Sequence, residues 1–94
     1  MELKNIQNLI KKKYYHLDSR SGPLFLLAVL FEEVGELAEA VRKNEKDSIK
    51  EELVDVLFMV LSLANLFNIE LEDLLIEKYI KGDPSKKWDL PEKE

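Results

Sequence analysis

Apolar residues recur along the chain at the three- and four-residue spacing of amphipathic helices. The first such stretch, with Leu3, Ile6 and Leu9 on one face, predicts a helix over about residues 2–15. The polar segment HLDSRSG then interrupts the periodicity. We therefore expect this segment to break the chain out of helical structure.

Pro23 marks the start of a second predicted helix, because proline suits the first helical turn, with Ser21 or Gly22 as its cap. This helix should run to about residue 43, where KNEKD forms a polar turn. Asp47 or Ser48 should then cap a third helix that lasts to about residue 67, since SIKE fits a capping box.

A fourth helix is predicted over about residues 71–81, stopped by Gly82 and Pro84, with an irregular tail over about residues 82–94. No segment alternates at period two, so we expect no sheet. Four helices with short connections predict an all-α protein, an antiparallel four-helix bundle in a single domain spanning residues 1–94. The third helix is apolar nearly all round, which predicts a homo-oligomer, either a dimer or a dimer of dimers.

Composition narrows the class of protein. A net charge of −5 disfavours binding to a nucleic acid polymer, which usually needs a basic face, and the absence of cysteine excludes disulfides and thiolate metal sites. The first residues lack the apolar core of a signal peptide, and the longest apolar run, VLFMVLSLANLF, is too short to cross a bilayer. We expect a cytoplasmic protein that does not bind membranes.

The acidic residues of the second and third predicted helices are crowded together. No basic residue lies between Phe31 and Val41, and Lys43 follows Glu39 at the four-residue spacing. The other acids lack such a neighbour, although like charges three or four residues apart destabilise a helix. Among them we expect Asp55 to be enclosed, because its helix face is otherwise apolar. The crowded residues are Glu32, Glu33, Glu36 and Glu39 on the second helix, and Glu51, Glu52 and Asp55 on the third.

Two interpretations of these carboxylates are open at this point. They form either a solvated helix face or a site for a divalent cation between two antiparallel helices, where all-oxygen ligands suit Mg²⁺. A dinuclear iron site is disfavoured, because it needs Glu-x-x-His on two helices and the only histidine, His16, lies outside both motifs.

The motifs EEVGE and ELVD, on consecutive helices, resemble the E-E-x-x-E and E-x-x-D pair of the MazG-like nucleotide pyrophosphohydrolases, in the all-α NTP pyrophosphatase superfamily. The resemblance covers about residues 18–78. It implies Mg²⁺ as the cofactor, for which Mn²⁺ would substitute, and an accessory catalytic role for Glu32. The implied metal ligands are Glu33, Glu36, Glu52 and Asp55.

The resemblance also implies substrate-binding residues. Lys78 matches a lysine that follows the fourth helix's apolar stretch, whereas Gly82 stands where the family has an asparagine. The other candidates are Lys86 and Lys87 for phosphates, Trp88 for a base, and Arg20 for the end of the triphosphate.

The reaction that the resemblance implies is hydrolysis of a nucleoside triphosphate to nucleoside monophosphate and pyrophosphate, which would remove unwanted nucleotides from the pool. A different class of function fits the composition equally well. The chain would then be a non-catalytic helical module, antitoxin-like or a scaffold subunit, whose acidic face docks a basic partner.

Overall fold

The computed structural model describes residues 1–82, and every regular element within that range is helical. This confirms the predicted all-α class. The predicted tail, including Lys86, Lys87 and Trp88, lies outside the described residues. The elements are α1 (Leu3–Ser21), α2 (Pro23–Lys43), α3 (Lys46–Leu66) and α4 (Glu72–Leu75), the last continuing into a π-helical turn, η1 (Ile76–Ile80).

Helix α1 is longer than its periodicity predicts. The segment HLDSRS does not break it but forms its last two turns, because most of these polar side chains are exposed and cost nothing to keep in a helix. The helix ends at Gly22, whose φ of 90° favours glycine and whose N–H donates to the Asp18 carbonyl at 2.9 Å. Pro23 then begins α2, as predicted.

The predicted end of α2 is confirmed, whereas the predicted start of α3 is wrong. Helix α2 ends at Lys43, followed by Asn44 in the left-handed conformation. Helix α3 begins at Lys46 after Glu45, and its first N–H groups receive no side-chain cap. The Asp47 carboxylate instead lies within the first turn, where it stabilises the positive end of the helix dipole.

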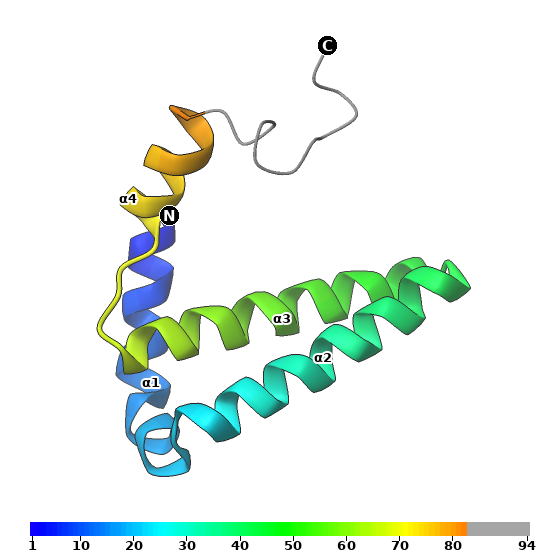
Figure 1. The fold of residues 1–94 in the computed structure, drawn as a ribbon, viewed down its shortest axis with the longest axis horizontal. Coiled ribbons are helices and arrows are strands. Elements are labelled where there is room, and N and C mark those ends of the chain that lie inside the picture. The colour runs from blue at the N-terminus through cyan, green and yellow to red at the C-terminus, as the bar shows by residue number, and fades with distance from the viewer. Residues whose placement is uncertain (83–94) are drawn as a thin grey trace.

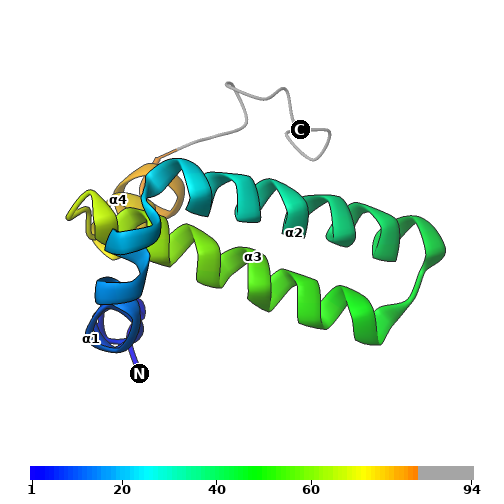
Figure 2. The same cartoon turned by 90° about the horizontal axis from the view of Figure 1, so that it is seen from below.

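Helices α2 and α3 form an antiparallel hairpin, and α1 crosses one end of it (Figures 1 and 2). Helix α4 lies beside the N-terminal end of α1, beyond the hairpin (Figure 1). The described part of the chain therefore does not form the predicted antiparallel four-helix bundle by itself. Short connections predicted four neighbouring antiparallel helices, but Gly22 turns α2 across α1 instead of alongside it.

A buried polar clamp holds α1 against the end of α3. The Gln7 side-chain amide donates to Asn65 Oδ1 at 3.0 Å and to the Ile69 carbonyl at 2.7 Å, and Asn65 Nδ2 donates to the Gln7 carbonyl at 3.2 Å. The Leu71 N–H donates to Gln7 Oε1 at 3.2 Å. Because every polar atom of the two amides has a partner, burying them is tolerated, and the start of α4 is fixed to α1.

The apolar core is small. Only Leu26, Ala40, Leu61 and Ala64 are buried hydrophobic residues among those described. Large apolar side chains remain exposed along the hairpin, which is unusual for a stable monomer. On α2 and α3 these are Leu24, Phe25, Phe31, Val34, Val41, Leu53, Val54 and Leu57.

Candidate metal centre

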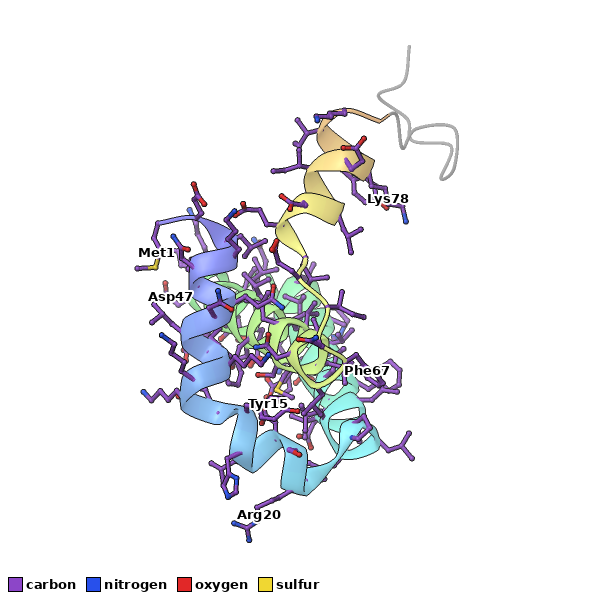
Figure 3. The ribbon with its side chains drawn as sticks, turned by 90° about the vertical axis from the view of Figure 1, so that its left-hand side faces the viewer. Met1, Tyr15, Arg20, Asp47, Phe67 and Lys78 are labelled. Atoms are coloured by element: carbon purple, nitrogen blue, oxygen red, sulfur yellow. The ribbon has the colours of Figure 1, made fainter. Side chains whose placement is uncertain are left out.

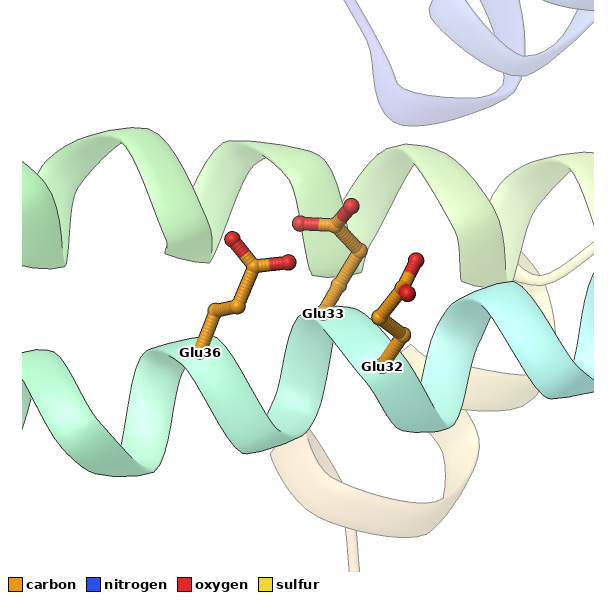
Figure 4. A group of neighbouring side chains, drawn as sticks. All are labelled: Glu32, Glu33 and Glu36. Carbon is orange, nitrogen blue, oxygen red and sulfur yellow. The ribbon is translucent and has the colours of Figure 1, made fainter.

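Two groups of carboxylates, which share Glu33, lie between α2 and α3. In the first group, Glu32, Glu33 and Glu36 each offer an oxygen within 4.8 Å of the others. Figure 4 shows these three carboxylates pointing from α2 toward α3. In the second group, Glu33 meets Glu52 and Asp55 of α3 within the same 4.8 Å. The hairpin thus gathers acids from both sequence motifs into one cluster, which we call the carboxylate cluster.

Helix geometry explains why these acids meet. Glu33 and Glu36 are three residues apart and share one side of α2, and Glu52 and Asp55 do the same on α3. The short connection at residues 44–45 makes the two helices antiparallel neighbours. The two sides consequently face each other near the middle of the hairpin.

Glu52, and not Asp55, is the enclosed carboxylate. Its Oε1 atom has almost no solvent-accessible surface and no hydrogen-bond partner among residues 1–82, whereas Asp55 is exposed. The prediction for Asp55 was wrong because the apolar character of a helix face does not show which side meets α2. Asp55 lies about 60° around the helix from Glu52, so it borders the interface instead of entering it.

The pKa of Glu52 is raised from 4.5 to about 7. The largest cause is the neighbouring Glu33 carboxylate, to which a protonated Glu52 donates a hydrogen bond. Desolvation and the negative charges of Glu36, Glu33 and Asp55 raise it further. The neutral form is favoured because, among residues 1–82, no basic side chain offsets these charges.

The residues present fit a hard divalent cation. The donors are all carboxylate oxygens, which Mg²⁺ and Mn²⁺ prefer, and Glu52 Oε1 is an enclosed acceptor without a partner. A cation would offset the same charges that raise the pKa of Glu52. A dinuclear iron site does not fit, because neither carboxylate group includes a histidine and His16 is exposed on α1.

The remaining acids of the two motif segments differ in surroundings. Glu39 is exposed and pairs with Arg42 at 3.5 Å and Lys43 at 3.8 Å. Glu51 is exposed on α3. Neither residue belongs to a group of acids that could hold a metal ion within the described chain.

The structure does not bring together Arg20 and Lys78, the two candidate phosphate-binding residues within residues 1–82. Arg20 is exposed at the end of α1 remote from α4, which leads into η1 and Lys78 (Figure 3). Lys78 lies beside an apolar cavity whose α3 residues are Leu57, Val60 and Leu61. Leu57 and Val60 lie about 140–200° around α3 from Asp55. Lys78 is therefore on the far side of α3 from that carboxylate.

One feature near the cluster was missed by sequence reasoning. Tyr14 and Phe58 form an edge-to-face aromatic pair with ring centroids 5.1 Å apart, and Phe58 follows Asp55 by one helical turn. No pattern in the sequence predicts this pair, because it depends on how α1 crosses α3.

Within residues 1–82 the fold is all-α, and acids from two consecutive helices meet in the carboxylate cluster. The MazG nucleotide pyrophosphohydrolase domain matches residues 21–86, well over half of the chain. The chain therefore belongs to the MazG nucleotide pyrophosphohydrolase domain family, which confirms the resemblance drawn from its motifs.

A curated relative is also similar to this chain. Uncharacterized protein YpjD from Bacillus subtilis (strain 168) is 44% identical over 62 residues. The match covers 55% of this chain and 56% of the relative, so it spans only about half the length of either protein. No helix within residues 1–82 is both long and apolar enough to cross a membrane.

Proposed function

We propose that this protein is a Mg²⁺-dependent hydrolase that converts nucleoside triphosphates to nucleoside monophosphate and pyrophosphate, and so removes unwanted nucleotides from the cytoplasmic pool. The observation that carries the proposal is the meeting of Glu33 and Glu52 across the hairpin, next to Asp55. Membership of the MazG domain family supports the class of reaction.

In this proposal the metal ligands are Glu33, Glu36, Glu52 and Asp55, and Mn²⁺ can replace Mg²⁺. When bound, the cation would neutralise phosphate charge and make the α-phosphorus more electrophilic. The four carboxylates stabilise the bound cation. Without the cation they repel one another, and the relief of this repulsion favours metal binding. The enclosed Glu52 Oε1 would gain the hydrogen-bond partner that it lacks among residues 1–82.

Glu32 is the proposed accessory catalytic residue. It is exposed and adjoins Glu33 and Glu36, so its carboxylate can accept a proton from a water molecule at the edge of the cluster. The water oxygen would form a bond to the α-phosphorus, and the bond from that phosphorus to the bridging oxygen would break. Pyrophosphate leaves with the electron pair of the broken bond.

We also propose that the active protein is a homo-oligomer with α3 in the interface. The exposed apolar residues of α2 and α3 supply the surface. Because Lys78 lies on the far side of α3 from Asp55, it would approach the carboxylates of a second copy more readily than those of its own chain. Arg20, Lys86, Lys87 and Trp88 complete the proposed substrate-binding set.

A product screen tests this proposal. Purified protein with Mg²⁺ is incubated with each of the common and damaged nucleoside triphosphates, and monophosphate and pyrophosphate are measured separately. We expect equal amounts of the two products from at least one substrate, and none after the metal is chelated. No hydrolysis of any nucleotide, with thermal stability unchanged by Mg²⁺ or Mn²⁺, would instead support a non-catalytic interaction module.

A further inference from the structure

A small polar pocket lies between the first half of α1 and the connection from α3 to α4. Its volume is ≈ 80 Å³, which is several times what one water molecule needs and far below the volume of a site for a drug-sized ligand. We call it the amide pocket, because four of its lining residues carry side-chain amides. A pocket of this size and polarity suits a small ion.

The polar clamp between α1 and α3 forms the buried part of the amide pocket. Gln7 is 3% exposed and Asn65 is 5% exposed, and both line the pocket. Beside them on α1, Lys4, Asn8 and Lys11 follow one another at four- and three-residue spacing, so they share one face of the helix. The clamp thus holds this face against the end of α3.

The amide pocket carries positive charge in an acidic protein. Its charged lining residues are Lys4, Lys11 and Glu70, which give a net charge of +1, whereas the whole chain has −5. Neither lysine forms an ion pair within residues 1–82. The only acid of the lining, Glu70, is exposed. The two ammonium groups therefore lack a counter-ion among the described residues.

Lys11 is the better enclosed of the two lysines. It is half-buried, its ammonium donates to Asn68 Oδ1 at 3.3 Å, and it lies 5.5 Å from the centre of the Tyr15 ring. Because Asn68 accepts this bond through its side-chain oxygen, its amide N–H groups remain free to donate within the described chain. The Asn8 amide likewise has no partner there. Charged and neutral donors thus line one pocket.

We propose that the amide pocket binds a small oxyanion of the phosphate class. Lys4 and Lys11 supply charge, and the side-chain N–H groups of Asn8 and Asn68 supply neutral hydrogen bonds. The volume admits one phosphate group but no nucleoside beside it. Since Lys11 belongs to α1 and Asn68 to the connection that leads into α4, a bound oxyanion stabilises the contact between these segments.

This site is separate from the carboxylate cluster. Asn65, at the α3 side of the amide pocket, lies about 15 Å along the helix from Asp55, at about 1.5 Å per residue. None of the residues that would hold the oxyanion belongs to the proposed metal or substrate set. The inference consequently does not depend on the proposed function.

A titration followed by NMR tests the inference. The ¹⁵N-labelled protein is titrated with orthophosphate at neutral pH and constant ionic strength. A chelator is present, so that no cation can hold phosphate at the carboxylate cluster. The side-chain amide signals of Asn8 and Asn68 should shift and saturate. Lys11→Gln should weaken binding about tenfold, since a hydrogen bond to a charged group contributes about that much.

Two further variants sharpen the test. Lys12→Gln is the matched control for Lys11→Gln, because Lys12 is its neighbour on α1 but is exposed and outside the pocket. It should bind phosphate as wild type does. Glu70→Gln removes the one negative charge of the lining and should strengthen binding, because it raises the net charge of the pocket.

A titration with a nucleoside monophosphate identifies the source of the phosphate group. The same amide shifts with an affinity no higher than that of orthophosphate would assign the site to free phosphate. The same shifts with a higher affinity would assign it to the phosphate of a nucleotide. Both results support the site.

Two results would overturn the inference. The first is that the Asn8 and Asn68 amide signals do not shift to saturation with either ligand. The second is equal phosphate affinity in wild type, Lys11→Gln and Lys12→Gln. If Lys11→Gln does not fold, Glu70→Gln decides, because unchanged or weaker phosphate binding in that variant would contradict the site. The proposed hydrolase activity would stand in each case.

Discussion

The carboxylates of Glu33 on α2 and Glu52 on α3 lie with oxygens within 4.8 Å of each other, and Glu33 is the largest of the causes that together raise the pKa of Glu52 to about 7. Two acids held this close share a proton or a cation. At neutral pH the proton is only partly retained, so the pair is ready to exchange it for a metal ion.

The first prediction concerns pH and the metal-free protein. Because the folded protein holds the Glu52 proton up to about pH 7, whereas the unfolded chain releases it near 4.5, stability falls as pH rises through that window. Glu52→Gln removes this dependence. Thermal midpoints measured with chelator from about pH 4 to about pH 8 should show wild type losing stability relative to Glu52→Gln as pH rises. A constant difference between the two proteins would contradict the raised pKa.

The second prediction concerns metal binding. Asp55→Asn and Glu36→Gln keep the shape of the side chains but lose the charge that holds a hard cation. Wild type should gain about 2.7 kcal/mol of stability at a Mn²⁺ concentration a hundredfold above its dissociation constant. The two variants should gain little at the same concentration, with unchanged helical circular dichroism, and should lose hydrolytic activity.

Glu39→Gln is the matched control for metal binding. Glu39 is on the same helix as Glu36, but it pairs with Arg42 and Lys43 on the exposed surface. Its loss should change stability by less than about 1 kcal/mol and leave the Mn²⁺ effect intact. Equal Mn²⁺ stabilisation of wild type, Asp55→Asn and Glu36→Gln would refute the ligand assignment.

The third prediction concerns the polar clamp between α1 and α3. Asn65→Ala leaves the buried amide of Gln7 without one of its partners and should destabilise the protein by about 1–3 kcal/mol in urea unfolding. Asn8→Ala is the control, because Asn8 is exposed on α1 next to Gln7 and is not part of the clamp. Equal effects of the two substitutions would mean that the clamp contributes little.

The fourth prediction concerns assembly. Val54 is 66% exposed and Leu57 is 51% exposed on α3, so Val54→Lys with Leu57→Lys should disrupt an α3 interface while sparing the fold of one chain. Light scattering at micromolar concentration should give wild type a mass of at least two 11.0 kDa chains, and the double variant a lower mass. A wild-type mass of one chain would contradict the oligomer.

The sequence predicted the helices better than their ends and their arrangement. Periodicity and Pro23 placed α2 within its observed bounds, because a proline start and a polar turn act locally. The extension of α1 through HLDSRS was not predictable in this way, since exposed polar residues are compatible with both helix and loop. The crosswise packing of α1 depends on contacts such as Gln7 with Asn65, which are 58 residues apart.

The carboxylate cluster was likewise predicted from the sequence only in part. Three-residue spacing indicated that Glu52 and Asp55 lie close together on α3, because that spacing fixes which side chains share a face. It did not show that Glu52 is enclosed while Asp55 is exposed, since this depends on how α3 is rotated against α2. The Tyr14–Phe58 pair was not predictable for a similar reason, because it forms only where α1 crosses α3.

The most direct test of the central claim is to find which bond of the nucleotide is broken. The substrate identified in the product screen is hydrolysed with Mg²⁺ in ¹⁸O-labelled water, without added pyrophosphatase, and the products are analysed by mass spectrometry. Attack at the α-phosphorus predicts monophosphate that carries the label and unlabelled pyrophosphate as the first products. Nucleoside diphosphate and orthophosphate as the first products would contradict a pyrophosphohydrolase.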